Sequence, residues 1–377
     1  MIKKKIAIVY DWLDKWGGVE RILLVFHEIF PEADFFTSYY DVDGAYWAKD
    51  INVKTSFLQH FPNFIKKNRI LSFVFYPYTF ESFNYSDYDL VISVTSSFAK
   101  GIVTKPGTKH ICYLLTPTRY LWVQPENYFK NKFINFCLVP YINHIKKWDF
   151  VAAQRPDKII SISKTVADRC QKYYQRESEV IYPPFNIDYW SQLKFKIQNS
   201  KFETNFKFKI SNFKFFLVVS RLESYKKIDL VVRSFNRSNQ NLIIVGEGSQ
   251  ENILKAMAGK NIQFFKKLTD EELGYLYSQA QALIMPQEED FGYVSLESLF
   301  FDCPVIAFKK GGATETIVDG KTGLFFSKQS EISLLQALER FNKISYNLKR
   351  VIQENKKRNL DRFSKKEFIR NFRQLAD

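Results

Sequence analysis

The chain reads Ala282-Leu-Ile-Met-Pro286, then Glu289-Asp-Phe-Gly-Tyr-Val-Ser-Leu-Glu297, then Pro304-Val-Ile-Ala-Phe308. Two short apolar runs of strand length enclose a loop and a segment with helical spacing. Short, continuous apolar strands that alternate with helices are typical of a parallel sheet that is covered on both faces. This order therefore predicts one strand–loop–helix–strand unit of an α/β domain.

The same alternation extends through the rest of the C-terminal half. Further strands are expected at 215–220, 242–246 and 262–265, and helices at 228–237, 250–258, 270–279, 293–301 and 313–318. Thr269 precedes three acidic residues, a pattern that indicates a capped helix start. We therefore predict a doubly wound α/β domain over 215–355.

The N-terminal half repeats this pattern with longer insertions. Strands are expected at 5–10, 34–39, 89–94, 110–115 and 158–163. They predict a second α/β domain over 1–190. Residues 191–214 are a duplication rich in lysine, phenylalanine and asparagine, which we interpret as a linker that carries an insertion. The final segment, 356–377, is amphipathic.

The composition fits a globular protein and narrows its compartment. A chain of 377 residues is long enough for two domains. No apolar run approaches the roughly 20 residues that are needed to cross a bilayer. The four cysteines include no Cys-x-x-Cys pair, and the four histidines show no ligand spacing. We therefore expect a protein of the reducing cytoplasm that has neither disulfides nor a metal site.

Two carboxylates lie in the loop and the helix that follow the expected strand at 282–286. Glu289 and Glu297 can each accept hydrogen bonds from vicinal hydroxyls, which suits a polyhydroxylated ligand. Gly292 lets the backbone approach such a ligand, and the helix start near Tyr293 offers N–H groups to an anion. Two glutamates at this spacing also occur on solvated helix faces, so the prediction depends on their place after a strand.

Two other loops also follow expected strands. Trp16-Gly-Gly-Val-Glu20 comes after 5–10, and its glycines either let backbone N–H groups approach a phosphate or sugar or form an ordinary turn. Arg221 and Lys226 flank the loop after 215–220. Two cations there suit a diphosphate that leaves with growing negative charge, although a solvated basic loop has the same composition.

Taken together, these segments resemble the retaining GT-B glycosyltransferases of family 4, which include bacterial mannosyltransferases of O-antigen and exopolysaccharide assembly. The residues that carry the resemblance are Gly17-Gly18, Arg221 with Lys226, Gly246-Glu-Gly248, Glu289 with Glu297, Gly311-Gly-Ala-Thr-Glu315, Gly320-Lys-Thr-Gly323, Thr116-Pro-Thr-Arg-Tyr120 and Ile181-Tyr-Pro-Pro-Phe-Asn186. The resemblance spans nearly the whole chain except 191–214. It implies two doubly wound Rossmann-like domains that face each other across a cleft, with a C-terminal helix in 356–377 that returns to the first domain.

The resemblance also implies roles for these residues. Arg221 and Lys226 would hold the donor diphosphate. Glu289 would contact the hydroxyls of the donor sugar, and Glu297 would bind the ribose. The other positions expected on the donor side are Gly17, Gly18, Gly246, Phe291, Gly292, Tyr293 and Val294.

The implied reaction is retaining transfer of a hexose from a nucleotide sugar to a glycan or lipid-linked acceptor in cell-surface polysaccharide synthesis. Mannose from GDP-mannose is the best guess for the donor. Enzymes of this family are pictured as supplying positioning and charge stabilisation for front-face attack, so no metal or other cofactor is expected.

One position departs from the family pattern. Related sequences typically carry a histidine where this chain has Leu115, and that histidine lies beside the donor sugar. His110 is about five residues away, roughly 16 Å along a strand, which is too far to replace it. Either the contact is dispensable, or the rate or specificity of the enzyme is altered. We expect Leu115→His to leave the fold intact.

Other interpretations remain open. A nucleotide-sugar 2-epimerase or a catalytically impaired homologue would share this architecture. Asp41-Val-Asp43 is similar to the metal-binding triplet of another glycosyltransferase fold, but we interpret it as a loop. The formal net charge of +15 permits contact with nucleic acid, yet no nucleic-acid module is present and none is expected as a partner.

Two segments, 57–83 and 126–150, combine aromatic residues with lysines. One interpretation is a helical hairpin that packs its aromatics in a core. The other is a surface that lies against an anionic membrane, which would place the protein at the inner face of the cytoplasmic membrane.

Overall fold

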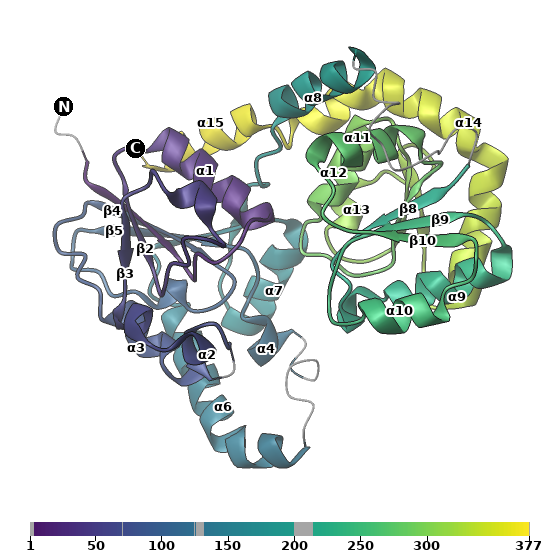
Figure 1. Cartoon of the computed structure of the whole chain (residues 1–377). Coiled ribbons are helices and arrows are strands. Elements are labelled where there is room, and N and C mark those ends of the chain that lie inside the picture. Colours follow the sequence, from purple (N-terminus) through teal and green to yellow (C-terminus); the bar gives the residue numbers. More distant parts are fainter. Residues whose placement is uncertain (1–3, 70, 124, 126–131, 200–213, 377) are drawn as a thin grey trace. The chain divides into compact units, whose positions relative to one another are not determined.

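The computed structural model describes the chain except for residues 1–3, 70, 124, 126–131, 200–213 and 377 (Figure 1). The described chain forms two compact units, each built around its own parallel sheet. The N-terminal unit comprises Met1–Pro184 and Lys366–Asp377, and the C-terminal unit comprises Phe185–Lys365. The prediction of two doubly wound α/β domains is therefore confirmed.

In the described part of the N-terminal unit, seven parallel strands pair in the order β3-β2-β1-β4-β5-β6-β7. The strands are β1 (Ile6–Tyr10), β2 (Asp34–Thr37), β3 (Val53–Thr55), β4 (Leu90–Thr95), β5 (Lys109–Leu114), β6 (Lys158–Ser161) and β7 (Glu179–Val180). The sequence analysis missed β3 and β7. These strands lie at the two edges of the sheet and are too short to show a periodic pattern.

Helices cover both faces of this sheet, because successive side chains of a strand point to opposite sides. In β2 the ring of Phe35 contacts His27, whereas the ring of Phe36 contacts Phe83. The helices are α1 (Gly18–Ile29), α2 (Asn63–Lys66), α3 (Tyr76–Glu81), α4 (Arg119–Trp122), α6 (Lys132–Ala152), α7 (Lys164–Tyr174) and α15 (Lys365–Ala376), with 3-10 turns η1 (Tyr46–Ala48), η2 (Phe57–His60), η3 (Ser72–Val74) and η4 (Ala99–Gly101). Figure 1 shows α1 and α15 over one face and α3 and α6 over the other.

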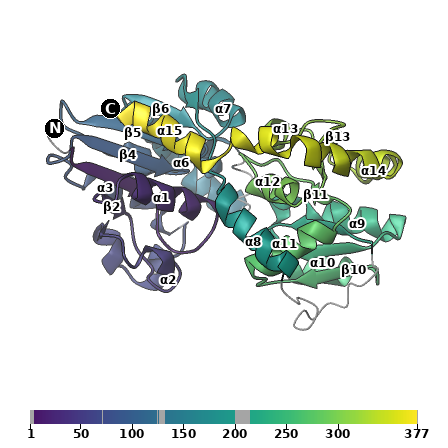
Figure 2. The same cartoon turned by 90° about the horizontal axis from the view of Figure 1, so that it is seen from above.

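Helix α15 belongs to the N-terminal unit although it follows the C-terminal unit in the chain. Phe368 and Phe372 are buried there. Their rings contact Phe26 of α1 and Tyr113 of β5 at centroid distances of 4.8 to 5.7 Å. The two phenylalanine rings also contact each other, with centroids 4.7 Å apart. Figure 2 shows α15 lying over the sheet of this unit. The implied return of a C-terminal helix to the first domain is confirmed.

In the described part of the C-terminal unit, six parallel strands pair in the order β10-β9-β8-β11-β12-β13. They are β8 (Phe216–Val219), β9 (Leu242–Val245), β10 (Ile262–Phe265), β11 (Leu283–Met285), β12 (Val305–Phe308) and β13 (Gly323–Phe326). The sequence analysis predicted all of these except β13, whose short apolar run follows the glycine-rich 320–323 segment. The chain starts in the middle of the sheet, builds toward β10, and then continues on the other side of β8.

The helices of this unit are α8 (Ile187–Asn199), α9 (Ile228–Ser238), α10 (Glu251–Met257), α11 (Asp270–Gln279), α12 (Tyr293–Phe300), α13 (Ala313–Thr316) and α14 (Glu331–Asp361), with the 3-10 turn η6 (Ser224–Lys226). Figure 1 shows α9 and α10 on one face of the sheet and α11 and α12 on the other. Thr269 and Glu272 form a capping box at the start of α11, so the predicted helix cap is confirmed.

Part of the segment that was interpreted as a linker is helical. Residues 191–199 continue α8, which packs against α11. Trp190 is buried there, with its ring 5.8 Å from that of Phe301. Within the low-complexity segment, Leu193 is buried on this helix, whereas Phe195 is 69% exposed. The rest of that segment, 200–213, lies outside the described residues.

The aromatic segment 57–83 forms a series of short helical turns instead of a helical hairpin. Tyr76 and Phe80 are buried in the core of the N-terminal unit. Phe64 and Tyr78, by contrast, are 69% and 65% exposed. The segment therefore both completes the core and carries aromatic side chains on the surface.

The packing of α15 makes a testable prediction about stability. Phe372→Ala should lower the free energy of unfolding of the N-terminal unit by about 3–5 kcal/mol, because it leaves a cavity against Phe26 and Tyr113. Urea denaturation followed by circular dichroism measures this loss. Arg373→Ala, an exposed neighbour on the same helix, is the control and should change stability by less than about 0.5 kcal/mol. Equal stability of the two variants would contradict this packing.

Candidate active site

The carboxyl edge of the C-terminal sheet brings together two of the loops that the sequence analysis selected. β8 lies between β9 and β11, so the chain leaves β8 toward one side and returns later to the other. The loops after two such strands diverge, and ligands of doubly wound sheets bind at this switch point. The loop after β8 carries Arg221 and Lys226, and the loop after β11 carries Glu289 and Gly292.

Lys226 and Glu289 form an ion pair at this switch point. Nζ of Lys226 lies 2.5 Å from Oε1 of Glu289, and the two side chains are only 9% and 18% exposed. Nε2 of Gln287 donates a hydrogen bond to the same oxygen at 2.8 Å. The cation and the carboxylate are therefore held in place by each other and by the amide. The sequence analysis missed Gln287, because a glutamine after a strand fits an ordinary loop.

Glycines let three backbone segments approach one another around this pair. A Cβ on Gly246, whose φ is 150°, would overlap the carbonyl oxygen of Ser220. Gly311 has a φ of 73°, and its neighbour Gly312 donates its N–H to the Glu289 carbonyl at 2.8 Å. A Cβ on either of these two residues would overlap the backbone of the loop after β11. Glycine is needed at these positions for the loops to meet.

The segment from Phe291 to Val294 forms the start of α12. Its N-cap is Gly292, with a φ of 85° and no side chain to cover the first N–H groups of the helix, on Tyr293 and Val294. Phe291 is 3% exposed, and its ring packs against Tyr293 and Phe363. The ring of Phe291 therefore completes the interior, and a contact between Phe291 and the donor stays a prediction.

Glu297 is in a different environment from Glu289. It lies on α12 and is only 4% exposed. The hydroxyl of Tyr277, on α11, donates a hydrogen bond to its Oε2 at 3.0 Å. The sequence analysis did not identify Tyr277, because a tyrosine in an amphipathic helix usually serves packing alone.

Arg221 begins the same loop as Lys226 but is exposed. Its guanidinium has no hydrogen-bond or ion-pair partner among the described residues. The structure thus brings Lys226 to Glu289 and leaves Arg221 at the surface of the loop, next to Gly246.

Gly17 and Gly18 lie at the carboxyl edge of the N-terminal sheet and open helix α1. Gly17 is the N-cap, and Gly18 is the first helical residue. The carboxyl group of Glu20 is buried, and this burial raises its pKa, while the nearby backbone N–H groups of Glu20 and Val19 oppose the shift. The approach of Gly17 and Gly18 to a phosphate or sugar stays a prediction.

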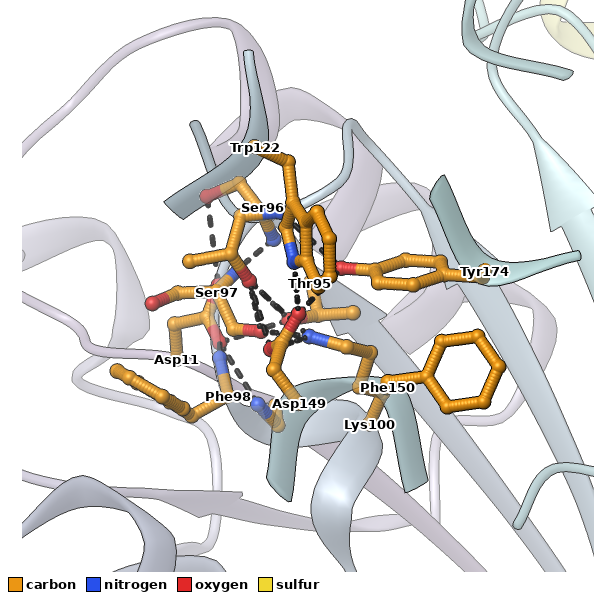
Figure 3. A network of polar contacts seen from close by, with 12 residues as sticks. Asp11, Thr95, Ser96, Ser97, Phe98, Lys100, Trp122, Asp149, Phe150 and Tyr174 are labelled. Atoms are coloured by element: carbon orange, nitrogen blue, oxygen red, sulfur yellow. Dashed lines mark hydrogen bonds and ion pairs between the residues drawn. The ribbon is translucent and has the colours of Figure 1, made fainter. Parts of the chain in front are cut away.

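A second buried carboxyl group, Asp11, follows β1 and fixes the neighbouring loop (Figure 3). Its shortest hydrogen bonds come from one hydroxyl and three backbone N–H groups. The donors, at 2.8 to 3.0 Å, belong to Thr95, Ser96, Phe98 and Ala99. Burial raises the pKa of Asp11, and these hydrogen bonds oppose the shift. The loop after β4 is therefore held by the strand next to it.

The same loop carries a buried ion pair (Figure 3). Nζ of Lys100 lies 2.6 Å from Oδ1 of Asp149, and the two side chains are 1% and 0% exposed. Asp149 also accepts hydrogen bonds from the hydroxyls of Thr118 and Tyr174 and from the indole of Trp122, at 2.7 to 2.9 Å. The pair thereby ties the loops after β4 and β5 to α6 and α7. No sequence motif indicates it, because its members are widely separated.

Leu115 lies directly after β5 and is 4% exposed. Its N–H donates to the Thr95 carbonyl at 2.8 Å. A histidine here would bury an imidazole, so we no longer expect Leu115→His to leave the fold undisturbed. His110, at the other end of β5, is a core residue with Nε2 2.8 Å from Oγ of Ser93, and burial lowers its pKa to about 3.

Asp41 and Asp43 lie in a loop, as the sequence analysis proposed. Oδ2 of Asp41 is 2.5 Å from Nζ of Lys67. Within the described ranges, no three His, Cys, Asp or Glu side chains gather where they could hold a metal ion. None of the described helices is long and apolar enough to span a membrane.

Comparison with solved structures agrees with this architecture. A crystal structure of Anabaena HepE in complex with UDP matches with a TM-score of 0.71, over 99% of each chain and at 16% sequence identity. At this identity the likeness shows the fold alone.

Residues 200–358 match the family described as glycosyl transferases group 1. An alpha-1,3/1,6-mannosyltransferase of Dictyostelium discoideum is 28% identical over 240 residues, which are 54% of this chain and 56% of the relative. A GDP-mannose-dependent alpha-(1-6)-phosphatidylinositol monomannoside mannosyltransferase of Mycolicibacterium smegmatis is 32% identical over 123 residues, 28% of this chain and 32% of the relative. The chain therefore spans about half or less of these relatives.

The family match, the relatives and the shared fold lead to one conclusion. The chain has the GT-B fold, its residues 200–358 match the glycosyl transferases group 1 family, and the resemblance seen in its motifs is thereby confirmed.

The buried histidine makes a prediction about acid stability. Because the pKa of His110 is about 3 in the fold and about 6.5 when unfolded, the unfolded chain binds an extra proton between these values. The stability from His110 is thus present above about pH 6.5 and is lost as pH falls, by up to about 1.4 kcal/mol per pH unit. His110→Gln should therefore show a flatter fall in unfolding free energy between pH 6.5 and 5. Parallel curves in urea titrations would contradict this.

Proposed function

We propose that this protein is a retaining hexosyltransferase that moves a hexose from a nucleotide sugar to a glycan or lipid-linked acceptor in cell-surface polysaccharide synthesis. The observation that carries this proposal is the ion pair of Lys226 and Glu289 at the switch point of the C-terminal sheet. It puts a cation suited to a diphosphate beside a carboxylate suited to sugar hydroxyls.

The ion pair explains how the site is kept ready for its ligand. Lys226 is largely buried, and an unpaired ammonium there would be unfavourable. Glu289 balances its charge until a diphosphate arrives. The ammonium can then contact the diphosphate while the carboxylate receives donor hydroxyls. Arg221, which is exposed beside it, supplies a second cation.

The chemistry follows from where charge develops. Cleavage of the glycosidic bond leaves negative charge on the nucleoside diphosphate and positive charge on the sugar ring. Cations at the diphosphate and a carboxylate at the sugar favour both changes, and fixed positions reduce the reorganisation that the reaction requires. The N–H groups at the start of α12 add a positive dipole end.

Glu297 is proposed to hold the ribose of the donor. It already accepts a hydrogen bond from Tyr277, which fixes its orientation for a pair of ribose hydroxyls. Mannose from GDP-mannose is the donor that we propose, supported by the activities for which the two mannosyltransferase relatives are named. UDP, found in the Anabaena structure, is the alternative nucleotide to test.

We propose that the reaction needs no metal, because the two cations of the loop after β8 carry out the charge stabilisation. Excess EDTA should then leave the initial rate unchanged in a donor-consumption assay. A rate that falls with EDTA and returns with Mg²⁺ would contradict this. The same assay without acceptor distinguishes transfer from a nucleotide-sugar 2-epimerase, which would still convert the donor.

Substitution of Glu297 and substitution of Glu289 should affect different steps, nucleotide binding in the first case and sugar transfer in the second. Glu297→Gln should weaken binding of GDP or UDP about tenfold or more, since it weakens hydrogen bonds to a charged group. Glu289→Gln should leave nucleotide binding undiminished, because it frees Lys226, but should lower transfer roughly 100-fold at saturating donor. Titration calorimetry and a turnover assay measure the two effects.

The matched control for this experiment is Glu288→Gln. Glu288 precedes Glu289 in the same loop and pairs with the exposed Lys310 at 3.0 Å, so its loss should change neither quantity. Equal loss of nucleotide affinity in the Glu289 and Glu297 variants would refute the division of roles. Failure of the wild type to bind any nucleotide would refute the proposed function.

We also propose peripheral contact with anionic membranes. The supporting observation is that Phe64, Leu71 and Tyr78 are 47% to 69% exposed on the turns of 57–83. Of the second aromatic segment, 126–150, residues 126–131 lie outside the described residues.

The membrane contact is tested by co-sedimentation with phosphatidylglycerol vesicles. The wild type should sediment at low salt and be released as salt rises, because the attraction is electrostatic and screened. A variant that combines Phe64→Ser and Tyr78→Ser should remain in the supernatant. If the wild type itself stays in solution at low salt, the exposed aromatics do not contact lipid.

A further inference from the structure

Two loops at the carboxyl edge of the N-terminal sheet lie side by side. One follows β1 over residues 11–17, and the other follows β2 over residues 38–50. The N–H of Leu13 donates to the Tyr39 carbonyl at 3.1 Å, and the N–H of Asp41 donates to the Leu13 carbonyl at 2.8 Å. The loops are therefore joined by backbone hydrogen bonds where they leave the sheet.

Further along, the two loops are joined by their tips. Gly44 runs so close to Asp14 that a Cβ on the glycine would overlap the carbonyl oxygen of the aspartate. The indole N–H of Trp47 donates to the Lys15 carbonyl at 2.9 Å. The rings of Trp16 and Trp47 then meet edge to face, with centroids 6.3 Å apart and an interplanar angle of 61°. Each tryptophan is thus held by the loop opposite.

A half-buried cation, Arg69, also contacts these loops. The guanidinium of Arg69 lies 3.8 Å from the ring centroid of Trp12 and forms an ion pair with Asp14. It also donates to the hydroxyl of Tyr39 at 2.8 Å. The loop after β1 is consequently fixed by Trp12 and Asp14 to the segment that carries Arg69.

On this rigid base, large aromatic side chains face solvent. Trp16 is 42% exposed and Tyr46, the neighbour of Trp47, is 56% exposed. We propose that Trp16, Trp47 and Tyr46 form an aromatic platform that receives a pyranose ring of the glycan acceptor. This inference rests on the proposed function, which requires an acceptor site in addition to the donor site.

The chemistry of the platform matches a sugar. A pyranose ring presents C–H groups on its face and hydroxyls on its rim. The electron-rich face of an indole attracts such C–H groups, and a rigid ring gives contact area at little entropic expense. The loop after β2 adds the carboxylates of Asp41 and Asp43, which accept hydrogen bonds from hydroxyls.

The same carboxylates argue against a lipid surface as the occupant. Asp41, Asp43 and Asp50 lie within the loop that carries Tyr46 and Trp47. Asp41 is balanced by Lys67, so Asp43 and Asp50 are the carboxylates that an anionic membrane would repel and that a neutral polyhydroxylated ring would use.

The platform is tested with protein that carries 5-fluorotryptophan, which gives a separate ¹⁹F signal for each of the six tryptophans. The signal lost in Trp16→Leu identifies Trp16. The probes are the methyl α-glycosides of mannose, glucose, galactose and N-acetylglucosamine. We expect at least one glycoside to shift the Trp16 signal saturably. The affinity for that glycoside is then measured in two variants from the shift of the Trp47 signal. Trp16→Leu should lower the affinity about tenfold or more, and Tyr46→Ala should lower it by a smaller factor.

The control is Phe195→Leu, which changes another aromatic side chain, 69% exposed on α8. It should bind the glycoside as the wild type does. All variants should also bind GDP or UDP with unchanged affinity in calorimetry. Nucleotide binding is thereby measured separately from glycoside binding. If the wild type binds no nucleotide, the proposed function is refuted, whereas the glycoside titration alone tests the platform.

Three outcomes would overturn the platform. No glycoside shifts the Trp16 signal, or Trp16→Leu binds the glycoside as tightly as the wild type. In the third, phosphatidylglycerol vesicles shift that signal while no glycoside does, which would make the loops a lipid contact.

Discussion

Parallel pairing of every strand is the constraint on which both units of this protein depend. A parallel strand can be joined to the next only by a crossover, so all the loops that follow strands open on one edge of their sheet. Residues remote in sequence must then meet at that edge. In the C-terminal unit they are Lys226 and Glu289, and in the N-terminal unit Asp11 meets the loop after β4. The candidate functional residues of both units therefore lie in the loops at these edges.

The buried ion pairs of the two units differ in how far their side chains are exposed. Lys100 and Asp149 are completely enclosed, and several hydrogen bonds satisfy the carboxylate, so the removal of either partner would leave a buried charge unbalanced. Such a pair suits a permanent structural joint. Lys226 and Glu289 are slightly more open, at 9% and 18% exposure. This pair can exchange partners with an anion and a polyhydroxylated ring without either charge losing its compensation. Exposure therefore separates the structural joint from the proposed ligand site.

Much of the fold and part of the site could be predicted from the sequence. Apolar runs of strand length and a capped helix at Thr269 repeat locally, so they appear in a single sequence. Position after a strand was enough to select Lys226 and Glu289. Contacts between distant residues leave no such signal, which is why Tyr277 and the pair of Lys100 with Asp149 were missed. Side-chain direction was also hidden: Phe291 lies in the expected segment, yet its ring points to the interior.

Helix α15 has a consequence for the order in which the molecule can be completed during synthesis. The N-terminal unit is made first, but Phe26 and Tyr113 remain uncovered until Phe368 and Phe372 leave the ribosome. The C-terminal unit, an insertion between these two parts, has all its residues available earlier. We expect the nascent chain to hold a closed C-terminal unit while the N-terminal unit stays open, with an apolar surface that chaperones would recognise until α15 emerges.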